Sequence, residues 1–259
     1  MRNFINLANI EKKDLREIIN HAIKQKKKNL IKNKDFPMKG KTLIMIFEKA
    51  STRTRLSFEL AMKQLGGDLL ILNPKDSHYG SGGESIHDTS KILSQYGDII
   101  MMRTLRHEHF LKFSKHLDIP IINGLTDLCH PCQIMSDVMT FEEMRGPIFN
   151  KKIAWLGDGN NVVYSLIEAS VKFDFQLAIA SPKKFSPNKN ILKWAERKKA
   201  KIFITKNPEE AVKKADCIMT DKWISMGDKA NKKNKKKLLK PYQVNNKIMK
   251  LAKSDAIFM

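Results

Sequence analysis

Short apolar runs alternate with longer stretches of helical periodicity along most of the chain. The runs that we expect to be strands form two series: 42–47, 68–72, 98–103 and 119–123, then 152–157, 176–181, 201–205, 216–221 and 255–259. Amphipathic stretches separate the runs at the short spacing that is typical of βαβ units and parallel sheets. The pattern therefore predicts an α/β protein with two doubly wound parallel-sheet domains.

The segment PCQIMSDVMTFEEMRGP, at residues 131–147, separates the two series of apolar runs. It predicts a long helix that ends before Gly146 and Pro147, because glycine and proline commonly follow the last helical turn. We interpret this segment as a hinge helix. The expected domains are residues 1–133 and residues 134–259, which suits a chain of 259 residues.

No apolar run approaches the roughly 20 residues that span a bilayer. The N-terminus, MRNFINLANIEKKDLREII, alternates charged and apolar residues and does not resemble a secretory signal. We therefore expect a cytoplasmic protein without a membrane partner. Cysteine is sparse, and the C-x-x-C pair Cys129 and Cys132 lacks the further ligands that a structural zinc site needs.

The formal net charge is +21, and the lysines cluster at residues 25–34, 196–201 and 229–241. Such runs are typically solvated faces, and aromatic residues are scarce among them. A nucleic-acid-binding surface is the alternative interpretation that this composition leaves open. A basic field would also attract anionic metabolites without specifying one.

The stretch STRTR, at residues 51–55, follows the first predicted strand and begins an amphipathic helical pattern. Backbone N–H groups and the positive end of the helix dipole meet at such a position, which makes it an anion site. Hydroxyl groups and guanidinium groups add donors that match phosphate oxygens. A simple N-cap would account for one hydroxyl, so the whole cluster favours phosphate binding.

STRTR after a strand, followed by a helix and a Gly-Gly stop, resembles the carbamoyl-phosphate site of the transcarbamylase family. Arg103 at the end of a later strand, and His130 and Gln133 in the segment HPCQ, match further positions of that family. The resemblance implies that the phosphate is held by Ser51, Thr52, Arg53, Thr54 and Arg103. It also implies that Arg103, His130 and Gln133 approach the carbamoyl group.

The loop PKDSHYGSGGES, at residues 74–85, is polar and rich in glycine. In ornithine-type members of the family, the matching loop reaches into the site of a neighbouring subunit. The resemblance therefore implies that His78 completes a carbamoyl-phosphate site in trans and that the protein is a homotrimer. A solvated surface loop is the alternative interpretation.

The segment WLGDGNNVVYSL has Gly157 and Gly159 after a predicted strand and so invites comparison with a dinucleotide fingerprint. The comparison fails, because Val162 replaces the third glycine and the next strand ends in Ser181 instead of an acidic residue. A nicotinamide-dependent dehydrogenase is therefore not expected.

The same segment, with TDKWISMG at residues 220–227, resembles the ornithine branch of the transcarbamylases. The resemblance implies that Asn161 binds the carboxylate of the amino acid. Asp221 and Ser225 would bind its α-amino group, and Met226 would bind it through the backbone. Lys222 stands where this family commonly has a neutral residue.

The implied reaction transfers the carbamoyl group of carbamoyl phosphate to the side-chain amine of L-ornithine, giving L-citrulline and phosphate in arginine metabolism. No metal or organic cofactor is implied, and Arg103, His130 and Asp221 are the implied catalytic residues. A transcarbamylase for putrescine or acetylornithine is an alternative, although putrescine has no α-amino acid group for Asp221 and Asn161 to hold. A non-catalytic, basic nucleic-acid-binding protein is the other.

The family continues after its last strand with a His-Cys-Leu-Pro segment, a further arginine and a C-terminal helix. The sequence stops at residue 259, before these features. We therefore expect a second domain that is incomplete at its C-terminus, and a truncated chain with weak or no transfer activity.

Overall fold

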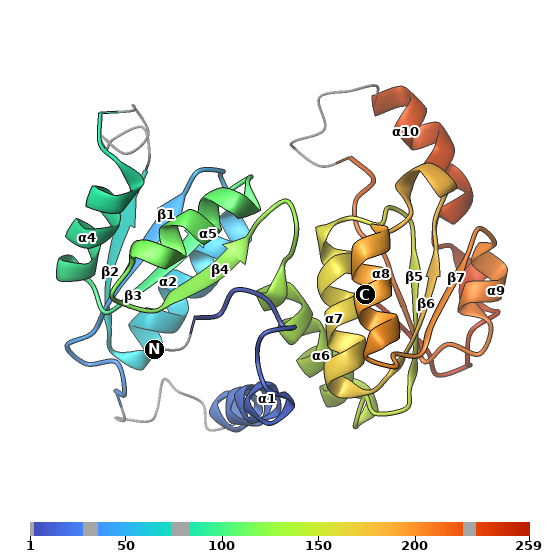
Figure 1. Ribbon diagram of the computed structural model, residues 1–259. Coiled ribbons are helices and arrows are strands. Elements are labelled where there is room, and N and C mark those ends of the chain that lie inside the picture. Colours follow the sequence, from blue (N-terminus) through green and yellow to red (C-terminus); the bar gives the residue numbers. More distant parts are fainter. Residues whose placement is uncertain (1–2, 28–35, 74–82, 225–231) are drawn as a thin grey trace. The chain divides into compact units, whose positions relative to one another are not determined.

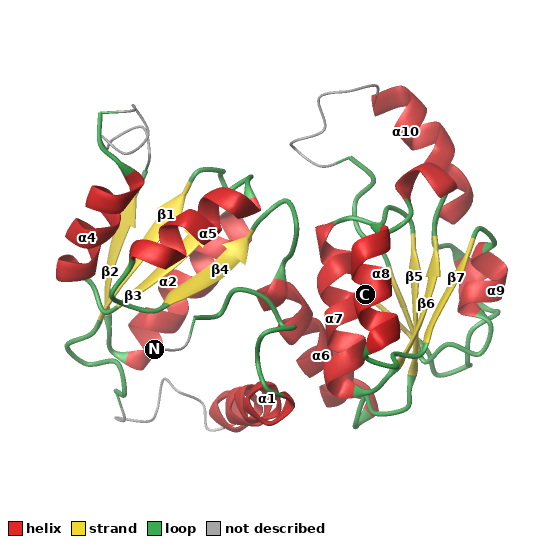
Figure 2. Ribbon diagram, in the orientation of Figure 1, coloured by secondary structure: helices red, strands yellow, loops and turns green. Residues whose placement is uncertain are grey.

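The computed structural model describes residues 3–27, 36–73, 83–224 and 232–259. The chain divides into two compact units, Met1–Cys132 and Gln133–Met259. Each unit has a parallel β-sheet with helices on both faces (Figures 1 and 2). The predicted class, two doubly wound α/β domains, is confirmed.

The first unit has its sheet in the order β2-β1-β3-β4, with every neighbouring pair parallel. Its elements are α1 (Lys12–Lys27), β1 (Thr42–Phe47), α2 (Thr52–Leu65), β2 (Asp68–Leu72), α4 (Ile86–Tyr96), β3 (Ile99–Arg103), α5 (His107–His116) and β4 (Ile121–Leu125). The strand expected at residues 119–123 begins later, because Pro120 has no N–H group to donate to the neighbouring strand.

Alternate residues of the central strands in this unit enter two separate apolar clusters. Ile44, Ile46, Ile100 and Met102 pack with Phe110 and Phe113 of α5, and the α4 residue Leu93 joins them. Leu43, Met45 and Met101 pack with Met62 of α2 on the opposite face. The near-continuous apolar strands follow from this, since a parallel sheet is buried on both faces.

Helix α2 has well-defined ends. Ser51 is its N-cap, and the Ser51 side chain accepts a hydrogen bond from the Thr54 N–H at 3.3 Å. Gly66 ends the helix with φ of 80°, a left-handed conformation in which a Cβ would also lie 2.6 Å from the Phe36 side chain. Glycine is therefore required there, as the Gly-Gly stop predicts.

The second unit has its sheet in the order β7-β6-β5-β8-β9, again with parallel pairs. Its strands are β5 (Lys152–Leu156), β6 (Gln176–Ala180), β7 (Ile202–Thr205), β8 (Cys217–Met219) and β9 (Ile257–Phe258). Its helices are α7 (Asn161–Phe173), η2 (Lys183–Phe185), α8 (Lys189–Arg197), α9 (Pro208–Val212), α10 (Lys232–Leu239), η3 (Lys240–Tyr242) and α11 (Asn246–Met249).

Alanines of β5 and β6 let short helices approach the sheet of this unit closely. Ala154, Ala178 and Ala180 pack against Ala211 and Val212 of α9, with Tyr242 and Ile248 at the rim of the cluster. Helix α7 has Leu166, Ile167 and Phe173 among its buried residues. Figure 1 shows α7 and α8 on one side of this sheet and α9 on the other.

Helix α6 (Pro131–Arg145) contains the boundary between the two units, which falls after Cys132. It ends before Gly146, whose φ is 71°, as the sequence predicts. Among the described residues, no helix is long and apolar enough to cross a membrane.

Candidate functional site

The sequence motif STRTR and the residue Arg103 meet at the switch point of the first sheet. Strands β1 and β3 are neighbours although β2 lies between them in sequence, and Phe47 pairs with Arg103 at their carboxyl ends. Open α/β sheets bind ligands outside the carboxyl ends of the strands where the strand order reverses. The predicted anion site therefore occupies the place that the fold offers to a ligand.

Arg103 and Thr54 are joined across this switch point, since the Arg103 Nη1 donates to the Thr54 Oγ1 at 2.9 Å. The Arg103 Nε is buried and has no hydrogen-bond partner among the residues that the structure describes. Burial lowers the pKa of Arg103, and the nearby charge of Arg53 lowers it further. Two cations and a helix N-terminus thus converge where an anion would neutralise them.

The loop after β1 is tied to the loop after β3 by Glu48. The Glu48 carboxylate accepts a hydrogen bond from the Thr104 hydroxyl and pairs with the His109 Nδ1 at 2.9 Å. Glu48 directly follows β1 and Thr104 directly follows Arg103, so this link holds the two loops of the switch point together. Sequence reasoning missed Glu48, because its partners are distant in the sequence.

His130 lies directly before α6, in the same unit as Arg103. Burial lowers its pKa to about 4, and the positive charge of Arg103 contributes to the shift. The imidazole is therefore neutral at neutral pH and can donate a ring N–H without adding a charge. The preceding Cys129 is buried, and its Sγ accepts a hydrogen bond from the Asn123 Nδ2 at 3.2 Å, which packs the loop behind His130.

The switch point of the second unit lies between β5 and β8. The loop GDGNN follows β5, and Asp221 follows β8. The Asn160 Nδ2 donates to the Asp221 Oδ2 at 2.9 Å, and the Lys222 N–H donates to the Asp221 Oδ1 at 2.7 Å. Asp221 is therefore held on both oxygens at the carboxyl end of the sheet, while the Lys222 side chain is exposed.

Two adjacent asparagines at the start of α7 have different positions: one caps the helix, and the other is its first residue. Asn160 is the N-cap, and its Oδ1 accepts from the N–H groups of Val162 and Val163 at 3.0 and 3.3 Å. Asn161, the predicted carboxylate ligand, is the first residue of the helix and is partly buried. Sequence reasoning missed Asn160, whose position before an apolar helical run is a capping signal.

Gly159 of this loop lies in close contact with the turn around η2. A Cβ on Gly159 would lie 2.6 Å from the Phe185 carbonyl oxygen, and the Gly159 N–H donates to that oxygen at 2.7 Å. A side chain at position 159 would therefore collide with the turn around η2.

Gln133 and Asp137 face each other on α6. The Gln133 Nε2 donates to the Asp137 Oδ1 at 2.9 Å. Burial raises the pKa of Asp137 to about 6, while the bond from Gln133 lowers it and the negative charge of Asp221 raises it. Sequence reasoning selected Gln133 and missed Asp137.

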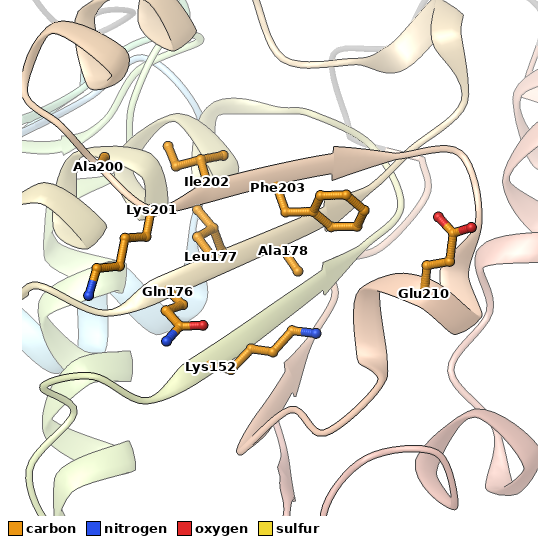
Figure 3. A pocket seen from close by; sticks show the side chains of 9 residues that line it. All are labelled: Lys152, Gln176, Leu177, Ala178, Ala200, Lys201, Ile202, Phe203 and Glu210. Carbon is orange, nitrogen blue, oxygen red and sulfur yellow. The ribbon is translucent and has the colours of Figure 1, made fainter.

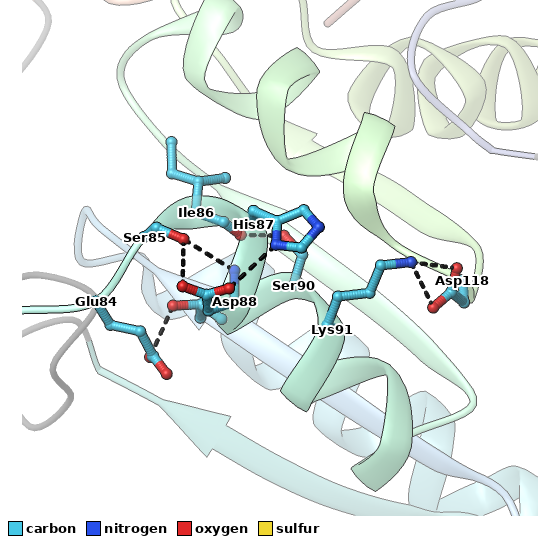
Figure 4. A network of polar contacts seen from close by, with 9 residues as sticks. Glu84, Ser85, Ile86, His87, Asp88, Ser90, Lys91 and Asp118 are labelled. Atoms are coloured by element: carbon cyan, nitrogen blue, oxygen red, sulfur yellow. Dashed lines mark hydrogen bonds and ion pairs between the residues drawn. The ribbon is translucent and has the colours of Figure 1, made fainter.

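Three predicted residues, His78, Ser225 and Met226, lie outside the described residues. The chain after the loop that contains His78 is anchored at the start of α4 (Figure 4). Ser85 is the N-cap and accepts from the Asp88 N–H at 3.1 Å, and the Thr89 hydroxyl donates to Glu84 at 2.8 Å. These contacts are local capping contacts.

A pocket of about 610 Å³ lies elsewhere, against β5, β6 and β7 in the second unit (Figure 3). Lys152, Gln176 and Ile202, which line it, are the first residues of these strands, so the pocket is at the amino end of the sheet. Ligands of open α/β sheets bind at the opposite end. It contains none of the predicted site residues, and we assign it no function.

Together, the two units form an α/β protein with cationic side chains at the switch point of the first sheet and a carboxylate at the switch point of the second. Residues 2–143 match the family described as aspartate/ornithine carbamoyltransferase, carbamoyl-P binding domain. Residues 150–259 match the description aspartate/ornithine carbamoyltransferase, Asp/Orn binding domain. The chain belongs to the aspartate/ornithine carbamoyltransferase family.

Individual relatives agree with this assignment. The chain is 48% identical over 259 residues to a protein of Rhodopseudomonas palustris named ornithine carbamoyltransferase, with 100% of this chain and 83% of that protein covered. The solved structure of ornithine carbamoyltransferase from Pyrococcus furiosus has a TM-score of 0.94 and 39% identity, covering 100% of this chain and 83% of that one. The solved structure of anabolic ornithine carbamoyltransferase from Campylobacter jejuni has a TM-score of 0.91 and 36% identity, covering 100% of this chain and 85% of that one.

Proposed function

We propose that this protein transfers the carbamoyl group of carbamoyl phosphate to the side-chain amine of L-ornithine, giving L-citrulline and phosphate. The observation that carries the proposal is the pair of oppositely charged switch points, Arg103 with Thr54 in one unit and Asp221 with Asn160 in the other. Relatives named ornithine carbamoyltransferase support ornithine as the acceptor.

The domain of residues 1–133 would bind carbamoyl phosphate. The phosphate would accept hydrogen bonds from the first turn of α2, from Ser51, Thr52, Arg53 and Thr54, and from the guanidinium of Arg103. The buried Arg103 Nε is a further donor at this site. His130 and Gln133 would contact the carbamoyl group, and His78 would be supplied by a neighbouring subunit.

The domain of residues 134–259 would bind ornithine. Asp221 and Ser225 would hold the α-ammonium group, Asn161 the carboxylate, and Met226 would contribute backbone contacts. The bonds from Asn160 and from the Lys222 N–H orient Asp221 for this role.

In the reaction, the amine nitrogen of ornithine attacks the carbonyl carbon, the bond from that carbon to the phosphate oxygen breaks, and the amine loses a proton. Arg103 and a ring N–H of His130 would stabilise the negative charge that develops on the carbonyl oxygen. The donors of STRTR would stabilise the departing phosphate. An alkyl amine has a pKa of about 10.4, so the reactive uncharged form must be taken up or generated in the site.

We also infer a homotrimer, in the cytoplasm, whose product would serve arginine biosynthesis. Apolar side chains on the surface of the first unit support self-association. Leu56 and Leu60 on α2 are 58% and 55% exposed, and Ile92 and Tyr96 on α4 are 45% and 67% exposed. Both pairs have i,i+4 spacing and so form apolar stripes on the helices that flank the edge strand β2.

The test is to incubate the purified protein with carbamoyl phosphate and one acceptor at a time, and to measure the carbamoylated product by mass spectrometry. Ornithine should give citrulline, while putrescine, acetylornithine and aspartate should give no product above the uncatalysed background. Arg103→Ala should abolish the ornithine signal. Product from another acceptor alone, or an unchanged signal in the variant, would contradict the proposal.

A further inference from the structure

Asp137 faces Gln133 from one helical turn further along α6. The Gln133 Nε2 donates to the Asp137 Oδ1 at 2.9 Å, and residues four apart on a helix are neighbours on its surface. Both residues belong to the unit Gln133–Met259, so their contact does not depend on how the two units are arranged.

The chemistry of this pair determines which end of the Gln133 amide faces Asp137. An ionised carboxylate only accepts hydrogen bonds, so the NH₂ end of the glutamine must turn toward it and the Oε1 must turn away. The two ends of the amide have nearly the same shape, so packing alone would not select one of them. The negative charge of Asp137 selects it.

The exposed Oε1 is then available to a ligand that donates a hydrogen bond. Gln133 lies three residues after His130 in the segment HPCQ. A carbamoyl group differs from an acetyl group by carrying an NH₂ group in place of a methyl group. An acceptor atom in this position would therefore recognise the NH₂ group, whereas a reversed amide would present another donor to it.

We propose that Asp137 is a positioning residue, which orients the Gln133 amide so that its Oε1 accepts a hydrogen bond from the carbamoyl NH₂ group. The consequence is a preference for carbamoyl phosphate over acyl phosphates that lack this group. The inference rests on the proposed function, because it places Gln133 beside the carbamoyl group.

The surroundings of Asp137 make its orienting effect dependent on pH. The charged group that acts on it is Asp221, after β8, and the Cys217 thiol of β8 lies within the field of Asp137, with a pKa raised to about 12, mainly by burial. Burial raises the pKa of Asp137 to about 6. Below that pH, the carboxyl group carries a proton that it can donate to the Gln133 Oε1, so both amide orientations become possible.

The experiment is calorimetric titration with fresh carbamoyl phosphate and with acetyl phosphate at pH 7.5. Asp137→Asn preserves the size of the side chain but presents both a donor and an acceptor to Gln133. It should lower the preference for carbamoyl phosphate about three- to tenfold, the size of one hydrogen bond, with acetyl phosphate affinity within about twofold of wild type. Glu142→Gln is the matched control on the same helix and should preserve the preference.

Two further readouts separate positioning from a structural role. In a Gln133→Ala background, Asp137→Asn should have no additional effect on the preference, because Asp137 acts through Gln133. In wild type, the preference should fall as the pH is lowered through about 6, whereas Asp137→Asn should show a low and constant preference.

The outcomes distinguish this inference from the function on which it rests. If the folded wild-type protein binds neither phosphate compound, the proposed function fails and the inference fails with it. If wild type prefers carbamoyl phosphate and Gln133→Ala removes the preference but Asp137→Asn does not, only the inference fails. Equal weakening of both ligands by Asp137→Asn, with a lower melting temperature, would assign Asp137 a structural role and overturn the inference.

Discussion

The two switch points use the same construction with opposite charge. In each unit, a hydrogen bond connects elements that follow or end neighbouring strands: Arg103, the last residue of β3, to Thr54 in the first turn of α2, and Asn160, after β5, to Asp221, after β8. Arginine side chains lie at the first switch point, and aspartate side chains lie at the second. The comparison indicates that the fold fixes where a ligand would bind, while a few side chains at that position would determine the charge of the ligand.

Each site also places like charges near one another. The charge of Arg53 lowers the pKa of Arg103 after burial, and the charge of Asp221 raises the pKa of Asp137 after burial. A ligand of opposite charge relieves this repulsion on binding. Each group of like charges therefore costs folding stability, as is common where a protein binds a charged ligand.

The largest effect is expected from removing the cation of the first switch point. Arg103→Ala would delete at least two charge-assisted hydrogen bonds to the phosphate, each worth about 1.5–3 kcal/mol, and should weaken carbamoyl phosphate binding about 100- to 10,000-fold in calorimetry. Arg106→Ala makes the same change at an exposed position after β3 and is the control. Equal losses in the two variants would mean that the effect is only one of net charge.

The matching change in the second unit should affect the other ligand. Asp221→Asn keeps an acceptor for Asn160 but loses the charge, so binding of L-norvaline, an ornithine mimic without the side-chain amine, should weaken about 10- to 100-fold in the presence of carbamoyl phosphate. Carbamoyl phosphate binding should be unchanged. Lys222→Ala, at an exposed side chain, should leave both affinities intact. If Asp221→Asn lost carbamoyl phosphate binding, the assignment of carbamoyl phosphate to the first unit and of ornithine to the second would be wrong.

Burial of His130 predicts a pH dependence of stability. Its folded pKa of about 4 lies below the ordinary value of 6.5, so the unfolded chain binds the proton more readily. The free energy of unfolding should fall as pH drops from about 6.5 to 4, by about 3 kcal/mol from this residue. Chemical denaturation at several pH values measures it, and His130→Asn should flatten the dependence. The same slope in the variant would assign it to other groups.

For Asp137, we expect the free energy of unfolding to depend on pH in the opposite direction. Its folded pKa of about 6 lies above the ordinary value of 3.8, so the folded state favours the protonated form and loses stability as pH rises from about 4 to 6. Asp137→Asn should therefore raise the free energy of unfolding at pH 7 by about 3 kcal/mol and change it little at pH 4. A lower stability of Asp137→Asn at pH 7 would contradict the inference that the ionised Asp137 destabilises the folded state.

The smallest effect is expected at the cap of α2. Ser51→Ala removes the acceptor for the Thr54 N–H and should lower the free energy of unfolding by about 1 kcal/mol. Ser57→Ala, on the same helix, removes only an exposed bond to the Thr54 carbonyl and should change stability by less than about 0.5 kcal/mol. If Ser57→Ala lowered the free energy of unfolding more than Ser51→Ala did, the hydroxyl of Ser51 would not be the main capping group of α2.

Much of the fold could be predicted, because local signals decide it. The apolar run at Thr42–Phe47, the N-cap at Ser51 and the left-handed Gly66 are all local in sequence, and the structure confirms them. The start of β4 was predicted two residues early because apolar character alone does not show that Pro120 lacks a donor.

The candidate site could be predicted only where residues adjoin a motif. Glu48 pairs with His109, and Asp158 pairs with Lys235 at 2.6 Å, with side chains 18% and 12% exposed. Such partners are far apart in sequence, and a single chain has no pattern that joins them. Likewise, the division of work between Asn160 and Asn161 depends on which one has extended backbone angles, which residue type alone does not determine.

The two oppositely charged switch points are tested most directly by sequential calorimetry on the wild-type protein, with carbamoyl phosphate first and then either L-norvaline or succinate. Succinate is a dicarboxylate that resembles aspartate without its amine. A second site built for aspartate would therefore bind succinate. We expect carbamoyl phosphate to bind first and norvaline to bind after it, whereas succinate should not bind, because Asp221 would repel an additional carboxylate. Binding of succinate but not of norvaline would contradict an acidic, ornithine-binding second site.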